Sequence, residues 1–316
     1  MAIFKDYLEN KSPLILHGAL GTEMESLGYD ISGKLWSAKY LLEKPEVIQK
    51  IHETYVAAGA DLITTSSYQA TLPGLIDAGL TKEEAEQIIA LTVQLAKNAR
   101  DKVWATLDDS EKAKRPYPLI SGDVGPYAAY LANGSEYTGD YGQITIEALK
   151  EFHRPRIQIL LDHGVDLLAL ETIPNYLEAQ ALIELLAEEF PEAEAYISFT
   201  VQEPGTISDG TSLDEIAQLV GQSDQILALG INCSSPLLYN QALAILKNAG
   251  KALITYPNSG EVYDGSTQTW KPKDKDALTL VEHSKDWHTQ FGVKILGGCC
   301  RTRPNDIKAL YAEFRT

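Results

Sequence analysis

Cysteine and basic residues are both scarce in this sequence. Three cysteines in 316 residues are too few, and odd in number, for a disulfide framework. Lysine and arginine total 27 against 44 acidic residues, which gives a formal net charge of −17. A field of this sign repels phosphate backbones and anionic lipid surfaces, so neither nucleic acid nor a membrane is expected as a partner.

Long hydrophobic runs and targeting signals are lacking as well. No stretch approaches the roughly 20 unbroken apolar residues that a membrane-spanning helix needs. The first ten residues include Asp6 and Glu9 and have none of the basic, apolar, cleavable pattern of a secretory signal. With so few cysteines, the reducing cytosol is the expected compartment, and we predict a cytoplasmic protein.

Short apolar, β-branched runs alternate along the chain with segments of helical spacing. Eight such pairs follow one another without a break in composition, which predicts an α/β fold of the (β/α)₈ TIM barrel type, formed by residues 1–316 as a single domain. A doubly wound open sheet is the main alternative. The predicted strands are Leu14–Gly18, Asp61–Ser66, Leu119–Val124, Asp166–Glu171, Ala195–Thr200, Leu227–Cys233, Leu253–Pro257 and Val293–Gly297.

Helix boundaries and long loops complete this prediction. Pro45 begins one helix that Gly59 ends, and the capping-box pattern of Thr81 and Glu84 begins another that runs through Lys102. Two loops, Ala19 to Lys44 and Gly125 to Thr145, are longer than simple barrel turns. Both follow the carboxyl ends of strands, where barrel enzymes assemble their sites, so we expect a lid or a substrate wall there.

All three cysteines lie at carboxyl ends of predicted strands. Cys233 ends the sixth strand, and Cys299 and Cys300 follow the eighth, so the barrel brings them to one mouth. Three soft thiolates without a fourth protein ligand are typical of a catalytic zinc site whose open position takes water or substrate. Adjacent residues on a strand point to opposite faces, and we expect Gly297 and Gly298 to turn both sulfurs inward through backbone angles closed to other residues.

Several other interpretations of these patterns stay open. The cysteine pair could be an inert buried pair or a vicinal disulfide, and the three thiols could form a metal or redox sensor. The two glycines could cradle a phosphate, although thiols suit phosphate poorly. A metal-dependent hydrolase would want more histidines at strand ends than His17, and a Schiff-base lyase would need a lysine on the sixth strand. His52 and His153, within helical patterns, are expected to be packed or solvated.

Motifs along essentially the whole chain resemble those of the homocysteine S-methyltransferase family, above all its short members that use S-methylmethionine. The pairing of GINC with GGCC is highly specific. The segments that carry the resemblance are LHGALGTEMESLG, LWSAKYLLEKPEVIQKIHETYVAAGADLITTSSYQAT, GPYAAYLANGSEYTGDY, ALETIPN, LGINCSSP, YPNSGEVYD and ILGGCCRTRP.

The resemblance implies a zinc ion held by Cys233, Cys299 and Cys300. It also implies that Glu171 holds the homocysteine amino group, whereas residue reasoning alone leaves Glu171 open as a satisfied structural acid. His17 is expected at the substrate as well, but the first loop of the family usually opens with Asp-Gly, so a histidine here leaves one of two acidic contacts to the amino group unaccounted for. The remaining expected substrate contacts are the backbone N–H groups of Gly18 and Ala19, the aromatic residues Trp36 and Tyr68, and the strand-end residues Thr65 and Asn232.

The expected reaction is methyl transfer from a sulfonium donor to homocysteine. Zinc deprotonates a bound thiol, and the thiolate attacks the methyl carbon of S-methylmethionine or, more slowly, of S-adenosylmethionine. Trp36, Tyr68, Tyr127 and Glu136 are expected to surround the cationic donor. Betaine as donor, selenocysteine as acceptor and the oligomeric state stay open, whereas the chain leaves no room for separate folate and cobalamin modules.

Overall fold

Eight parallel strands form one sheet in the computed structural model, which describes residues 3–33, 35–264, 269–271 and 277–315. The strand order is β1-β10-β7-β6-β5-β4-β3-β2, and a parallel bridge between Leu16 and Leu62 joins the two ends of that order. The sheet therefore closes, and the predicted (β/α)₈ barrel is confirmed. The strands are β1 (Leu14–Ile15), β2 (Leu62–Thr64), β3 (Leu119–Val124), β4 (Leu167–Ile173), β5 (Ala195–Phe199), β6 (Ile226–Asn232), β7 (Ala252–Tyr256) and β10 (Ile295–Leu296).

Several strands are shorter than the sequence predicts. β1 and β10 have two residues each, where five were expected. The residues beyond them still bond to neighbouring strands, since the Leu16 N–H donates to Leu296 O at 2.8 Å and the Gly297 N–H to Thr255 O at 2.9 Å. Only the regular ladder ends early, because the chain turns away there to form the mouth.

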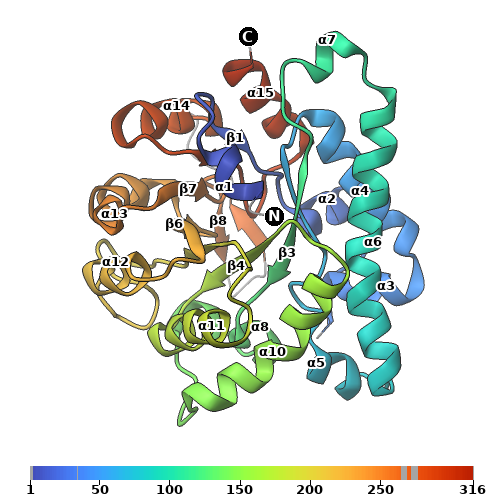
Figure 1. The fold of residues 1–316 in the computed structure, drawn as a ribbon, viewed down its shortest axis with the longest axis vertical. Helices are drawn as coiled ribbons and strands as arrows, with labels where there is room; N and C mark the ends of the chain where they lie inside the picture. Colours follow the sequence, from blue (N-terminus) through green and yellow to red (C-terminus); the bar gives the residue numbers. More distant parts are fainter. Residues whose placement is uncertain (1–2, 34, 265–268, 272–276, 316) are drawn as a thin grey trace.

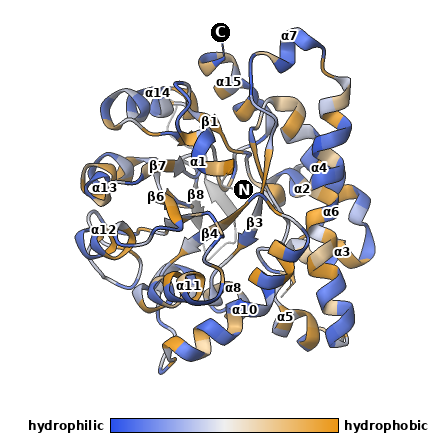
Figure 2. Cartoon of the chain, viewed as in Figure 1, coloured by the Kyte–Doolittle hydropathy of each residue, from blue (hydrophilic) through white to orange (hydrophobic). Residues whose placement is uncertain are grey.

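Helices surround the strands, as Figure 1 shows. In Figure 2 most of them carry both hydrophobic and hydrophilic residues, as expected for helices with one face on a sheet and the other in water. The first predicted helix begins at Pro45 and ends at Gly59, whose φ of 108° suits a glycine, and the second continues four residues beyond Lys102. The main helices are α4 (Pro45–Ala58), α6 (Lys82–Thr106), α10 (Ile146–Asp162), α11 (Tyr176–Glu189), α12 (Leu213–Gly221), α13 (Tyr239–Leu246), α14 (Leu280–Phe291) and α15 (Pro304–Phe314).

Apolar residues form two cores, one between the strands and the helices and one inside the barrel. Leu14, Leu62, Leu119 and Leu167 fill the amino-terminal half of the interior. The helix α1 (Ile3–Leu8) covers that end, with Phe4 fully buried against these leucines. The amino-terminal half of the interior is therefore a packed core, which leaves the carboxyl ends of the strands as the place for chemistry.

The long loops at the mouth carry short elements of their own. The first holds α2 (Leu20–Ser26), a 3₁₀ turn (Trp36–Ala38) and α3 (Lys39–Glu43), and the second holds α8 (Tyr127–Leu131) and α9 (Ser135–Thr138). A hairpin of β8 (Val262–Asp264) and β9 (Thr269–Lys271), which was not predicted, follows β7. Among the described helices, none combines the length and apolarity that crossing a bilayer requires.

Candidate metal and substrate site

The three cysteine sulfurs converge at the carboxyl end of the barrel. Cys233 directly follows β6, and Cys299 and Cys300 lie just after β10. Their Sγ atoms all lie within 4.8 Å of one another, and the Sγ atoms of Cys233 and Cys300 are 3.9 Å apart. Zinc–sulfur bonds of about 2.3 Å in a tetrahedron place two sulfurs about 3.8 Å apart. The three residues therefore fit a single zinc-sized ion.

A disulfide joins two of these sulfurs in the structure. Cys233 and Cys299 are bonded, with their Cα atoms 5.4 Å apart, and Cys300 is free. Burial raises the pKa of the Cys300 thiol to about 11, so without a metal this thiol is protonated at neutral pH. Metal binding needs thiolates, so the disulfide and the metal-bound state exclude each other.

Close packing, and not an unusual backbone angle, explains the two glycines before the cysteines. Neither Gly297 nor Gly298 has a positive φ, which corrects the expectation from the sequence. A Cβ on Gly297 would lie 2.7 Å from Leu16 Cβ, and one on Gly298 would lie 2.4 Å from Thr302 Oγ1. The turn is made just downstream, where Thr302 N–H donates to Cys299 O at 3.0 Å.

Strained backbone gathers around the site. Non-glycine residues with positive φ include Cys233 at 48°, Arg301 at 66° and Thr172 at 65°. Such conformations are unfavourable for residues with a Cβ and persist only where the surroundings enforce them. Cys233 directly follows β6, Arg301 follows the cysteine pair, and Thr172 lies within β4.

Glu171 is presented by an irregularity in β4. The register between β4 and β5 shifts between Leu170 and Ile173, the signature of a bulge. Both ends of the Asn232 amide hold this bulge, because Nδ2 donates to Thr172 Oγ1 at 2.8 Å and Oδ1 accepts from the Thr172 N–H at 3.0 Å. Asn232, expected as a substrate contact, is thus fully buried and occupied in positioning the residue next to Glu171.

The Glu171 carboxylate lies inside the barrel beneath the mouth. Its Oε2 accepts from the Tyr256 hydroxyl at 3.3 Å. Burial raises the pKa of Glu171 to about 7, against the lowering effect of nearby tyrosine hydroxyls. An acid in this state is poised to become fully charged when a cation arrives, since an opposite charge lowers its pKa.

Asp123 is a second buried acid in the same space, and we assigned it no role from the sequence. Leu119, Ser121 and Asp123 alternate along β3, with Leu119 in the interior core and Ser121 Oγ 3.0 Å from Thr64 Oγ1. Asp123 is 5% exposed, and burial together with the charge of Glu171 raises its pKa well above the usual range. An acid at the inward-facing end of a predicted strand was the signal in the sequence.

Thr65 holds the backbone of Asp123 in place. Its Oγ1 accepts from the Asp123 N–H at 2.9 Å and lies 2.8 Å from Ser67 Oγ, which in turn donates to Asp123 O at 2.8 Å. Thr65 is 2% exposed. It was expected to contact substrate, but the structure gives it this internal role.

A buried charged network behind the mouth fixes two of its loops. Arg156 of α10 is 1% exposed and donates to Tyr68 O at 3.2 Å and to Gly125 O. His153 Nε2 lies 2.8 Å from Glu178 Oε1, and His153 Nδ1 lies 3.1 Å from Arg156 Nη2. His153 is therefore packed, as the helical pattern indicated, whereas no pattern in the sequence pointed to Arg156 as the residue that ties these loops together.

His17 faces away from the barrel interior. Its ring centroid lies 5.7 Å from that of Tyr55 on α4, and its Nδ1 contacts Gly18 O. Burial lowers the pKa of His17 to about 4. It also lowers the pKa of His52, which lies on α4 as Tyr55 does, to about 3, so both rings are neutral at pH 7. The structure thus separates His17 from the Glu171 carboxylate, instead of placing it where an acid was expected.

The backbone amides of the first loop differ in their availability. The Ala19 N–H donates to Thr302 O at 3.2 Å, so it is already used. The Gly18 N–H has no hydrogen-bond partner among the described residues, and a Cβ on Gly18 would lie 3.0 Å from the Tyr55 ring. Of the two amides expected to receive a carboxylate, only that of Gly18 is open.

The residues expected around the methyl donor are only partly brought together. Tyr68 is buried near Glu136 and Glu171, and burial together with these negative charges raises the pKa of its hydroxyl well above the usual value, against the lowering effect of a hydrogen bond with Thr172. Trp36 packs over Gly21, where a Cβ would lie 2.7 Å from its ring. Tyr127 belongs to an aromatic cluster beside α10. Its ring centroid lies 5.0–5.8 Å from those of Phe152, Tyr141 and Tyr130.

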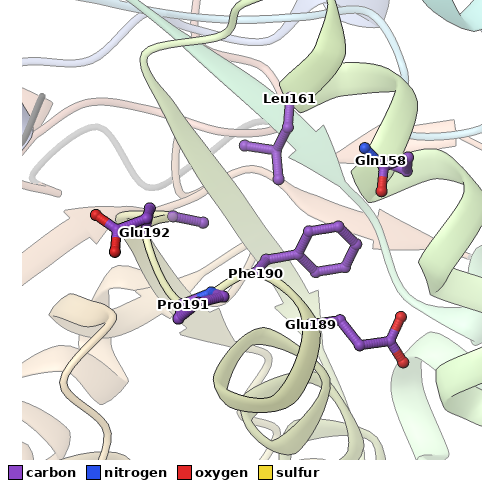
Figure 3. Close-up of a pocket in the computed structure, with 7 residues that line it drawn as sticks. Gln158, Leu161, Glu189, Phe190, Pro191 and Glu192 are labelled. Carbon is purple, nitrogen blue, oxygen red and sulfur yellow. The ribbon is translucent and has the colours of Figure 1, made fainter.

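A cavity elsewhere on the surface has no part in this site. Its volume is about 340 Å³, and it lies between the end of α11 and the start of β5, at the amino-terminal end of the barrel. Figure 3 shows Phe190 and Leu161 along it, with the carboxylates of Glu189 and Glu192 nearby. Nothing in this lining resembles the chemistry of the sulfur cluster.

A barrel with three converging thiols and buried acids at its mouth defines a class of thiolate-metal enzyme. The family model for homocysteine S-methyltransferase matches residues 14–314, and the chain belongs to this family. Homocysteine S-methyltransferase YbgG of Bacillus subtilis is 44% identical over 305 residues, which cover 96% of this chain and 95% of that one. The chain is thus a methyltransferase.

The chain is also similar to solved structures and to a relative named for a different acceptor, selenocysteine. The homocysteine methyltransferase MmuM from Escherichia coli matches in its metallated form with a TM-score of 0.85 and 41% identity, covering 98% of both chains. Its oxidized form matches with a TM-score of 0.84 and 41% identity, covering 97% of both chains. A selenocysteine methyltransferase of Astragalus bisulcatus is 40% identical over 311 residues, covering 94% of this chain and 91% of that one.

Proposed function

We propose that this protein transfers a methyl group from S-methylmethionine to homocysteine and uses zinc held by Cys233, Cys299 and Cys300. The observation that carries the proposal is the convergence of the three sulfurs within 4.8 Å at the barrel mouth that also contains the partly buried Glu171. Zinc bound there would supply Lewis acidity that keeps the substrate thiol deprotonated at neutral pH.

The transfer needs no general acid. The homocysteine thiolate forms a bond to the methyl carbon while the bond from that carbon to the sulfonium sulfur breaks, and the electron pair stays on the departing neutral thioether. Charge cancels between thiolate and sulfonium, and both products are methionine. The protein therefore has to orient the two sulfurs in line and keep water away.

Substrate contacts follow from the placement of charges. The Glu171 carboxylate would accept hydrogen bonds from the homocysteine ammonium, and the open Gly18 N–H would donate to its carboxylate. Tyr68 and the half-buried Glu136, whose pKa burial raises, would surround the sulfonium. Asn232, Thr65 and the Ala19 N–H would support these groups without touching the substrate.

A product analysis with each donor tests the proposal. Reduced, zinc-loaded protein is supplied with homocysteine and, in matched reactions, S-methylmethionine, S-adenosylmethionine or betaine. We expect the highest kcat/KM with S-methylmethionine and slower use of S-adenosylmethionine, whose nucleoside would need a slot of its own. A higher kcat/KM for betaine would overturn the choice of donor, and selenocysteine tested as acceptor decides between the two acceptors.

One observation favours a second function, a thiol-based redox or metal sensor. A disulfide joins Cys233 and Cys299, and in that state the same sulfurs would exclude the metal. A sensor would bind metal reversibly with oxidation but would form no methionine from homocysteine. The product assay described above therefore separates the two functions.

A further inference from the structure

Two carboxylates, the buried Asp123 and the partly buried Glu171, share the interior of the barrel mouth. Asp123 at the end of β3 and Glu171 in β4 lie on adjacent parallel strands, where Asp123 pairs in register with Ala169, two residues before Glu171. Leu167 and Ala169 of β4 point into the interior core, as Leu119 does in β3. By strand alternation, Asp123 and Glu171 both face the interior.

Neither carboxylate has a cation in hydrogen-bonding contact within the described part of the chain. Asp123 Oδ1 is buried and has no hydrogen-bond partner there, and Glu171 interacts with the neutral hydroxyls of Tyr256 and Tyr196. The nearest cation that acts on Asp123 is Arg156, whose guanidinium is bonded to carbonyls of the Ser67–Tyr68 and Gly125 loops. A buried charge without such a partner is unfavourable, and two like charges make it worse.

An ammonium group placed between the two acids would remove both problems. It carries three N–H donors and one positive charge, and so can bond to two carboxylates at once. Position 17, at the start of the first loop, offers no acid for this purpose, because the His17 ring is neutral at pH 7 and packs on Tyr55 of α4. The interior thus contains a second acid on β3, while position 17 carries none.

We propose that Asp123 is the second carboxylate that holds the homocysteine ammonium, together with Glu171, and that it does so from β3 in place of an acid in the first loop. The inference rests on the proposed function, because it deepens the acceptor site of that reaction. Asp123 would contact the substrate through its unpaired Oδ1. Thr65 and Ser67 would then act as positioning residues, since they bond to the Asp123 backbone.

The test compares homocysteine with mercaptobutanoate, the analogue that keeps the thiol and carboxylate but lacks the amino group. Both are titrated into zinc-loaded wild type and Asp123→Asn protein. We expect Asp123→Asn to weaken homocysteine by about ten- to a hundredfold, as for a lost charge-assisted hydrogen bond, and to leave mercaptobutanoate within about threefold. The KM for the methyl donor should stay within the same threefold range.

Matched controls separate a specific effect from damage to the fold. Asp162→Asn removes the same charge from an exposed position at the opposite end of the barrel and should change neither ligand. Thermal unfolding and zinc content establish that each variant is intact, and Asp123→Ser, which is also neutral but smaller, replaces Asp123→Asn if the latter does not fold. A merely structural role would weaken both ligands equally and would overturn the inference.

The outcomes also distinguish the inference from the proposed function. If wild type forms methionine from homocysteine but both Asp123 variants keep the full preference for homocysteine over mercaptobutanoate, the role of Asp123 is wrong and the proposed function stands. If wild type forms no methionine with any donor, the proposed function fails. A loss of preference that is confined to the Asp123 and Glu171 variants supports the shared site.

Discussion

The two ends of the barrel treat buried charge in opposite ways. At the amino-terminal end, the fully buried Asp61 contacts Arg115 at 3.5 Å and Arg315, and it also accepts from the Ile15 N–H at 2.9 Å. At the carboxyl end, the buried Asp123 and the partly buried Glu171 have no ion pair among the described residues. The chain neutralises its own charges where it needs stability and leaves them for a ligand where it binds one.

Backbone strain follows the same division. Thr172, Cys233 and Arg301, with positive φ, all lie at the carboxyl end, near the bulge or the cysteines. The amino-terminal end is covered by α1, where the Phe4 N–H donates to Glu194 Oε2 at 2.8 Å. This contrast is expected for a barrel enzyme, in which the amino-terminal end stabilises the fold and the carboxyl end carries the reaction.

The largest expected effect is the loss of the metal. Substituting Cys299 by alanine leaves two sulfurs, too few to hold a zinc ion tightly, so we expect metal content to fall from about one per chain to near zero and activity to disappear. Elemental analysis of the reduced protein measures this directly. Full zinc in Cys299→Ala would contradict the ligand set, and Ser259→Ala, beside the site but without a thiol, serves as the control.

A substitution at the amino-terminal end of the barrel should change stability alone. Asp61→Asn leaves Arg115 and Arg315 buried without their anion, and breaking a buried pair in this way costs about 3–5 kcal/mol of unfolding free energy. Denaturant unfolding measures the loss. In the fraction that remains folded we expect unchanged kcat and KM, and a changed KM for homocysteine would show that the two ends are coupled.

A substitution at the carboxyl end of the barrel should change the binding of homocysteine. Glu171→Gln removes the charge that meets the ammonium and should weaken homocysteine about ten- to a hundredfold, with little change in the KM for the donor. The raised pKa of Glu171 means that folding disfavours its charged form, so the variant should unfold at a higher temperature than wild type at pH 8. Lower stability together with unchanged binding would place Glu171 with the structural charges of the other end.

How much of this contrast the sequence predicts depends on how the chain builds each part. Cys233, Cys299, Cys300 and Glu171 end apolar strands, and the barrel rule alone brings them to one mouth. The direction of a side chain in a turn depends on contacts distant in sequence, so the packing of His17 on Tyr55 and the use of Asn232 to hold Thr172 could not be predicted. The predicted role of Gly298, a backbone angle closed to other residues, was also wrong. A glycine is needed there because a Cβ would collide with Thr302.

The pH dependence of binding distinguishes the ends through a titration. Methionine is the suitable ligand, because it has the ammonium but no thiol to titrate. Its affinity should fall about tenfold per pH unit below pH 7 as Glu171, whose pKa burial raises to about 7, becomes protonated. Calorimetric titration between pH 5.5 and 8, roughly one unit or more on each side of that pKa, measures it. The slope should become shallower in Glu171→Gln, where Asp123, whose pKa burial also raises, continues to titrate, and an unchanged slope would assign the titration to groups other than Glu171.

The smallest effect is expected at the position where the first loop departs from the family pattern. If an acid at that position simply restored a missing contact, His17→Asp would tighten homocysteine binding. The His17 ring, however, packs on Tyr55 of α4, and its Nε2 is buried without a partner among the described residues, so an aspartate there would face α4 and not the Glu171 carboxylate. With Asp123 already in the interior, we expect homocysteine affinity to change by less than about threefold and stability to fall, because the new carboxylate would be buried without a cation. Parallel titrations of His17→Asp and wild type, with thermal unfolding of both, measure the two quantities. Binding tightened by about tenfold or more would mean that the loop can turn this side chain inward and that the acceptor site lacks the second acid which β3 is inferred to supply.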